Sequence, residues 1–135
     1  MFPTIAIVSL LISLTPSGPV SFTELSQYLK VIASNGGFPG QIACRDVNIS
    51  MRLKKHGISV DFRSSVAWAS TIDQVCKFRD ERKFVICSDP EFLEFGACMA
   101  IIREHGKPVL MLNRKNYKAS GYLLPDIILK EAKTS

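Results

Sequence analysis

The stretch GISVDFRSSVAWASTIDQVCKFRDERKFVIC, residues 57–87, decides the fold class. Its first part alternates apolar and polar residues, which is typical of a half-buried strand; the apolar positions are Ile58, Val60 and Phe62. A helix is expected to begin at Ser64 or Ser65 and to continue to about Glu81; its apolar stripe consists of Trp68, Ile72, Val75 and Cys76. The run FVIC, residues 84–87, then indicates a buried strand. This β-α-β order predicts two parallel neighbouring strands joined by a crossover helix.

Upstream of this unit, the sequence predicts a helix over residues 21–34. Ser21 and Glu24 form a capping box, in which each side chain can bond a free backbone amide at the helix start. The apolar face of the helix consists of Leu25, Tyr28, Leu29 and Ile32. The glycine-rich NGGFPG, residues 35–40, follows a helix and precedes the probable strand QIACRDV, residues 41–47. A phosphate loop follows a strand and opens a helix, so this segment is a connection.

Downstream, the order of elements changes. Two apolar runs surround REHGK within residues 97–112, and they predict a β-hairpin with Gly106 in its turn. Residues 113–120 predict a short helix that ends at Gly121, and residues 125–133 predict a final helix with Pro125 in its first turn. We therefore expect a single compact α/β domain. Its mixed sheet is flanked by helices, and a C-terminal β-hairpin is followed by two short helices.

Length and charge limit the functions to be considered. The 135 residues suffice for one domain, and 17 basic against 12 acidic residues give a net charge of +5. Basic patches of this kind can meet phosphates or anionic lipids. No recognition helix or RNA-binding aromatic motif accompanies them, so no nucleic acid is expected as a partner.

The N-terminus, residues 1–20, has two interpretations. Its mostly apolar run from Ile5 to Leu14 is too short to span a membrane, and it suits the core of a secretory signal, although no Lys or Arg precedes it. The alternative is a buried first strand, TIAIVSLL. With the signal, the protein is periplasmic, and residues 21–135 form the mature domain.

The four cysteines are candidate disulfide or redox residues: Cys44, Cys76, Cys87 and Cys98. None forms a C-x-x-C pair, so neither a metal site nor a cofactor is predicted. In an exported chain they permit two disulfides in any of three connectivities. In a cytosolic chain they are expected to be small buried side chains.

Asp89 is the most conspicuous acidic residue, because it follows the buried strand of residues 84–87. It could accept a phosphoryl group as in receiver domains, with Asp61 near the same sheet edge. The favoured interpretation is that Ser88 or Asp89 caps the turn PEFLEF, since Pro90 suits a helix's first turn. No catalytic residue is predicted, because no nucleophile elbow is present. A cysteine–histidine site assembled in space, with His56 or His105 at turns, is a further alternative.

The C-terminal half resembles the YfiR-like family of small bacterial periplasmic proteins. The resemblance rests on a strand followed by a Ser-Asp turn, a glycine before a hairpin, a strand ending in Leu-Asn, and a glycine turn before the last helix. The matching positions are Ser88, Asp89, Pro90, Phe92, Gly96, Met99, Gly106, Leu112, Asn113, Gly121, Ile128, Leu129, Lys130 and Ala132. Upstream the resemblance is weaker and reaches about residue 20. Ala97 and Cys98 depart from the family's second glycine and methionine, and no cysteine pairing carries over.

The resemblance implies a regulator that is not an enzyme. Members of the family restrain a membrane-bound diguanylate cyclase by binding its periplasmic part, and they respond to redox state through disulfides. It therefore implies a role in cyclic-di-GMP signalling and biofilm control, and a homodimer is compatible with it. The alternative that the residues leave open is a cytosolic receiver-like or small-ligand-binding α/β domain.

Overall fold

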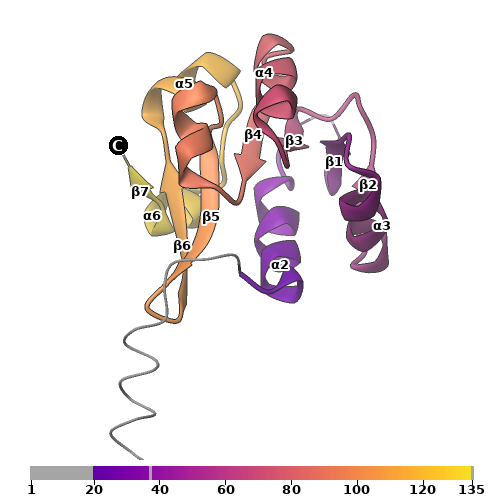
Figure 1. Ribbon diagram of the computed structural model, residues 1–135, viewed down its shortest axis with the longest axis horizontal. Helices are drawn as coiled ribbons and strands as arrows, with labels where there is room; N and C mark the ends of the chain where they lie inside the picture. Colours follow the sequence, from indigo (N-terminus) through magenta and orange to yellow (C-terminus); the bar gives the residue numbers. More distant parts are fainter. Residues whose placement is uncertain (1–19, 37, 135) are drawn as a thin grey trace, which may run out of the picture.

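The computed structural model describes residues 20–36 and 38–134. The predicted signal or first strand falls on residues 1–20 and, except for Val20, lies outside the described residues. A seven-stranded sheet in the order β2-β1-β3-β4-β5-β6-β7 forms the centre of the domain (Figure 1). The strands are β1 (Gln41–Cys44), β2 (Ser59–Val60), β3 (Val66–Trp68), β4 (Phe84–Cys87), β5 (Met99–Glu104), β6 (Lys107–Leu112) and β7 (Lys133–Thr134).

Helices cover both faces of this sheet. They are α2 (Phe22–Ile32), α3 (Val47–Lys55), α4 (Ile72–Asp80), the 3-10 helix η1 (Pro90–Phe95), α5 (Arg114–Ser120) and α6 (Asp126–Glu131). One core takes its buried side chains from α2, α3 and α6, among them Leu29, Leu53 and Ile128. The second core, on the other face, takes Phe78 from α4 and Leu93 from η1. The mixed α/β architecture expected from the sequence is therefore confirmed.

The strand order reverses between β1 and β3. Helix α3 leads from β1 to its parallel neighbour β2, and α4 leads from β3 to its parallel neighbour β4. The two helices pack into different cores, so these connections leave the sheet on opposite faces. In open parallel sheets the carboxyl ends of the strands separate at such a reversal and leave a crevice in which ligands bind.

The predicted helix start at Ser64 or Ser65 is wrong. Ser64 is buried, its hydroxyl donates to the Gln41 carbonyl at 2.7 Å, and it accepts from the Val66 amide at 3.2 Å. These bonds fix the start of β3, which has only three residues and shows no alternation. The helix begins after Thr71, whose hydroxyl accepts from the Gln74 amide.

The pairing predicted for the residue 58–62 strand is also wrong. It forms β2 at the edge of the sheet, and β1 and β3 lie between it and β4. The crossover helix joins β3 and β4 instead. Helix α3 was not predicted; the Asp46 carboxylate caps it by accepting from the Ile49 amide at 3.1 Å.

The C-terminal hairpin is confirmed. Strands β5 and β6 pair antiparallel from Met99 to Glu104, and the turn places His105 and Gly106 at φ 50° and 78°. Two successive positive φ values give the turn whose twist matches that of the strands. Helices α5 and α6 follow, and β7, which was not predicted, adds to β6 in parallel.

Candidate ligand-binding site

A crevice of about 340 Å³ lies at the carboxyl ends of the central strands. Trp68 ends β3, Ser88 follows β4, and Ile101 lies on the part of β5 beyond its pairing with β4. Helices α2 and α3 form the other walls. The apolar lining is Phe22, Leu25, Ile49, Trp68 and Ile101 together with Val20, and the polar lining is Ser21, Arg52 and Ser88. The crevice thus lies beside the reversal of strand order.

Arg52 provides the only charge in this lining. Its guanidinium carbon lies 4.3 Å from the centroid of the Phe22 ring, a cation–π arrangement. Within residues 20–36 and 38–134, no carboxylate lies within 4.0 Å of the Arg52 side chain. The arginine is thus positioned by an aromatic face while its N–H donors face no fixed anion.

Trp68 forms an apolar wall with a fixed orientation. The side chain is only 4% exposed, and its indole N–H donates to the Ser70 hydroxyl at 3.0 Å. The Ser70 amide in turn donates to the Gln74 side-chain oxygen at 2.8 Å, at the start of α4. Because this is the only tryptophan in the chain, its signal belongs to one residue that lines the crevice.

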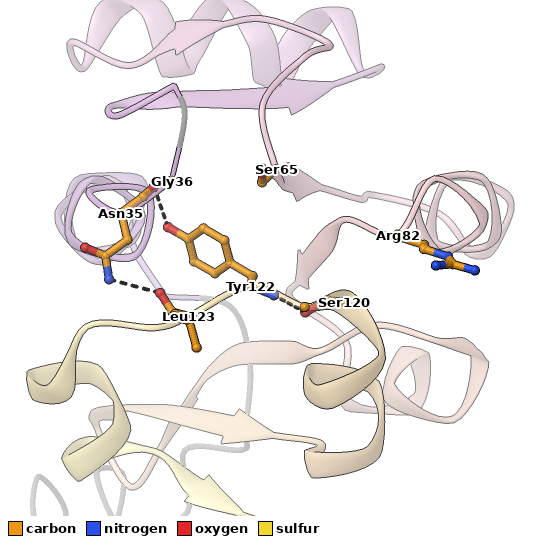
Figure 2. Close-up of a pocket in the computed structure, with 8 residues that line it drawn as sticks. Asn35, Gly36, Ser65, Arg82, Ser120, Tyr122 and Leu123 are labelled. Carbon is orange, nitrogen blue, oxygen red and sulfur yellow. Dashed lines mark hydrogen bonds between the residues drawn. The ribbon is translucent and has the colours of Figure 1, made fainter.

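A second hollow, of about 410 Å³, lies at the amino ends of the strands, and Figure 2 shows its lining. Its polar groups already bond one another. The Tyr122 hydroxyl shares its one proton between the Ile32 and Asn35 carbonyls, at 2.6 and 2.9 Å, and the Asn35 side-chain amide donates to the Leu123 carbonyl at 2.9 Å. The Arg82 guanidinium points away from the hollow. We therefore assign these residues to holding the C-terminal segment against α2.

Several residues that carried the family resemblance lie at helix ends. The Asp89 carboxylate caps η1 by accepting from the Glu91 amide at 3.0 Å, and Pro90 begins that helix. Gly96 ends it at φ 126°, and Gly121 ends α5 in the left-handed region. Of this motif only Ser88 lines the crevice.

Two asparagines join the separate parts of that motif. The Asn113 side chain caps α5 by accepting from the Asn116 amide at 2.9 Å. The Asn116 side-chain amide donates to the carbonyls of Leu93 and Ala97, each at 2.8 Å. The Asn116 side chain therefore fastens α5 to η1 and to the residue that follows Gly96. Sequence reasoning missed Asn116, whose bonds reach residues distant in the chain.

The structure contains none of the disulfides that an exported chain would permit, and all four cysteines are free. Cys44 and Cys98 are buried in one core and Cys87 in the other, while Cys76 is half-buried. Burial raises the pKa of the Cys87 thiol to about 12 and that of Cys98 to about 11, and it also raises the pKa of Cys44. Thiols with such raised pKa values hold little reactive thiolate at neutral pH.

The acidic pair of the receiver-like alternative does not assemble. Asp61 follows β2 and Asp89 follows β4, with two strands between them. The Asp61 carboxylate instead accepts from the Arg63 side chain at 2.8 Å, and this bond lowers the pKa of Asp61 to about 2. His56 packs against Phe22 at the end of α3, and His105 lies exposed in the hairpin turn.

Two further features are absent from the described part of the chain. No helix within residues 20–36 and 38–134 is long and apolar enough to cross a membrane. Over the same residues, no three His, Cys, Asp or Glu side chains are grouped as metal ligands.

Comparison with known proteins supports the fold. No family model and no curated protein matches the chain. A conserved domain protein from Vibrio cholerae matches with a TM-score of 0.57 and 15% identity over 83% of this chain and 59% of the other. The ABC domain from Streptococcus pneumoniae, solved in complex with L-Trp, matches with a TM-score of 0.56 and 13% identity over 83% and 60%.

The chain thus spans about three fifths of each structure that it resembles. At these identities the likeness concerns the α/β fold alone. The YfiR-like resemblance has no counterpart among these matches and stays a prediction from the sequence.

Proposed function

We propose that this protein is a small-ligand-binding domain without enzymatic activity, and that it holds an apolar carboxylic acid in the carboxyl-end crevice. The observation that carries the proposal is the Arg52 guanidinium, which lies on the Phe22 ring beside an apolar crevice and faces no carboxylate of the described chain. An arginine so placed offers two parallel N–H donors to a carboxylate.

The shape of the crevice fits a small molecule. Its volume, about 340 Å³, lies within the range of about 300 to 1,000 Å³ usual for ligand pockets. Apolar walls with few polar groups are also the usual lining of such pockets. We expect the ligand's apolar body to contact Phe22, Trp68 and Ile101 while its carboxylate meets Arg52.

The comparisons add indirect support. One of the two solved structures compared above is described as a complex with L-Trp, an amino acid that combines an aromatic body with a carboxylate. The redox regulator implied by the YfiR-like resemblance needs reactive cysteines, whereas three of the four are buried. The small-ligand alternative from the sequence is therefore the function that we propose.

Isothermal titration calorimetry tests the proposal. We would titrate L-Trp, L-Phe and L-Leu, and separately their primary amides, into the wild-type chain, Arg52→Gln and Lys55→Gln. Lys55 is the matched control, because it is an exposed base on the same helix that does not line the crevice.

At least one acid should bind the wild type and Lys55→Gln equally. The amide of that acid should bind the wild type about tenfold more weakly than the acid does. The acid itself should bind Arg52→Gln about tenfold more weakly than the wild type, a loss of about 1.4 kcal/mol in binding free energy. Binding of none of the acids, or equal affinity for Arg52→Gln, would overturn the proposal.

A further inference from the structure

A third hollow, of about 500 Å³, lies on the far side of α3 from the crevice and reaches strand β2. Three large apolar side chains that line it are exposed to an unusual degree: Val47 is 73% exposed, Met51 55% and Phe62 58%. Most large apolar side chains of a folded domain are buried in its core. A cluster of exposed ones therefore indicates a surface that contacts another molecule. We refer to this cluster, with Arg45 and Lys54, as the α3–β2 patch.

The charges on the α3–β2 patch are all of one sign. The charged side chains that line the hollow, Arg45 and Lys54, are both basic. Helix α3 has no acidic residue in its first turn, and of the three basic residues in its last turn Lys54 lines this hollow, whereas Arg52 lines the crevice. The guanidinium carbon of Arg45 lies 5.5 Å from the centroid of the Phe62 ring, so a cation is held beside the aromatic side chain of the patch. Its nearest carboxylate is Glu81, at 3.5 Å.

The patch adjoins one end of the sheet. Strand β2 pairs with β1 and, among the strands that the structure describes, with no other. The outer edge of a terminal strand carries backbone groups that can pair with an added segment of protein. Val60 of β2 itself lines the hollow, so a segment lying along this edge would also reach the apolar side chains of the patch.

We infer that the α3–β2 patch docks an acidic segment of a partner protein that carries apolar side chains. Charge complementarity with Arg45 and Lys54 sets the sign of the segment. The hollow can receive side chains of a partner, whereas binding to a flat bilayer requires side chains that protrude from the protein. The adjoining edge of β2 can also pair with a peptide backbone. These features favour a protein segment over an anionic lipid surface.

The inference does not depend on the proposed ligand. The α3–β2 patch and the carboxyl-end crevice lie on different sides of α3, and no residue lines both. Either site could be removed by substitution without touching the lining of the other. An experiment on the patch therefore fails or succeeds independently of the proposed function.

The test selects peptides from a displayed library of random ten-residue sequences on the immobilised wild-type chain. The double variant Phe62→Ser, Lys54→Glu serves for counter-selection. Both side chains are exposed, so the variant should fold, which circular dichroism would verify. Selected peptides are then measured by fluorescence polarisation against the wild type, each single variant, and Lys118→Glu, an exposed lysine of α5 that lies outside the patch.

Enriched peptides should combine Asp or Glu with apolar residues, and Phe62→Ser and Lys54→Glu should each weaken their binding at least tenfold. Lys118→Glu should change it less than twofold. No enrichment, enrichment of basic sequences, or equal binding by the patch variants would overturn the inference. Sedimentation with phosphatidylglycerol vesicles is the second measurement. Vesicle binding that is lost in the same two variants, with no peptide selected, would assign the patch to a membrane surface instead.

Discussion

The guanidinium of Arg52 and the ring of Phe22 lie 4.3 Å apart, and this contact joins α3 to α2 beside the carboxyl-end crevice. A cation on an aromatic face is held through its flat surface. The N–H groups at the rim of the guanidinium therefore stay available to a ligand. The pair can position the charge before a ligand arrives, which reduces the ordering cost of binding.

The cysteines should differ sharply in reactivity. Cys44, Cys87 and Cys98 are buried with raised pKa values, whereas Cys76 is half-buried. A thiol-reactive chromophore at pH 7.5 should therefore modify one thiol rapidly, and the other three only after denaturation. Loss of the rapid phase in Cys76→Ser identifies it. Rapid reaction of three or four thiols in the folded chain would contradict the burial described here and would restore the redox hypothesis.

Tyr122 should contribute more to stability than an ordinary surface tyrosine. The residue is 7% exposed, and its hydroxyl shares its one proton between two carbonyls, those of Ile32 and Asn35. Tyr122→Phe leaves these acceptors without their donor and should lower the free energy of unfolding by about 1 to 3 kcal/mol. Urea denaturation measures the change. Tyr28→Phe, at a half-buried position on α2, is the control and should change it by less than about 0.5 kcal/mol.

Gly96 should be much less replaceable than Gly121, although both belong to the resemblance motif. A Cβ at Gly96 would lie 2.5 Å from the Arg79 side chain at φ 126°, whereas a Cβ at Gly121 meets nothing within 4 Å at φ 70°. Gly121→Ala should cost about 1 to 2 kcal/mol, the usual cost of a left-handed residue. Gly96→Ala should cost more, because a steric clash is added. Equal thermal midpoints for the two variants would contradict this difference.

Asp61 should make stability depend on acid. The Arg63 side chain lowers the pKa of Asp61 from 3.8 to about 2, so the folded state releases this proton more readily than the unfolded state. The contribution is therefore fully present above about pH 4 and is lost as the pH falls toward about 2. Urea denaturation at several pH values between about 4 and 2 gives the free energy of unfolding, which should fall less steeply with decreasing pH for Asp61→Asn than for the wild type. An equal dependence of this free energy on pH in the two proteins would show that the ion pair between Asp61 and Arg63 does not form in solution.

Elements with local signals could be predicted from the sequence. The bonds that start α2, η1 and α5 come from Ser21, Asp89 and Asn113, each within three residues of the amide it accepts from. The hairpin could also be predicted from the sequence, because Gly106 lies between two apolar runs. Strand β3 was not, since its three residues show no period and its start is set by the Ser64 hydroxyl on Gln41, a distant residue.

The candidate site was harder to predict than the fold. Its lining comes from α2, α3, β3, β5 and the turn after β4, which only the tertiary structure brings together. In the sequence, Arg52 is one of several basic residues, and Trp68 fits the stripe of a helix that in fact begins after Thr71. The motif that stands out, Ser88 to Gly96, mainly serves to turn the chain.

The most direct test of the central claim uses the indole N–H of Trp68, which gives the single tryptophan side-chain signal in a nitrogen–proton NMR spectrum of the uniformly labelled protein. The ligand would be the unlabelled acid that binds best by calorimetry. We predict a saturable shift of this signal in the wild type and Lys55→Gln, with about tenfold more ligand needed in Arg52→Gln. A signal that stays fixed while the acid binds would place the ligand elsewhere and contradict the crevice as the binding site.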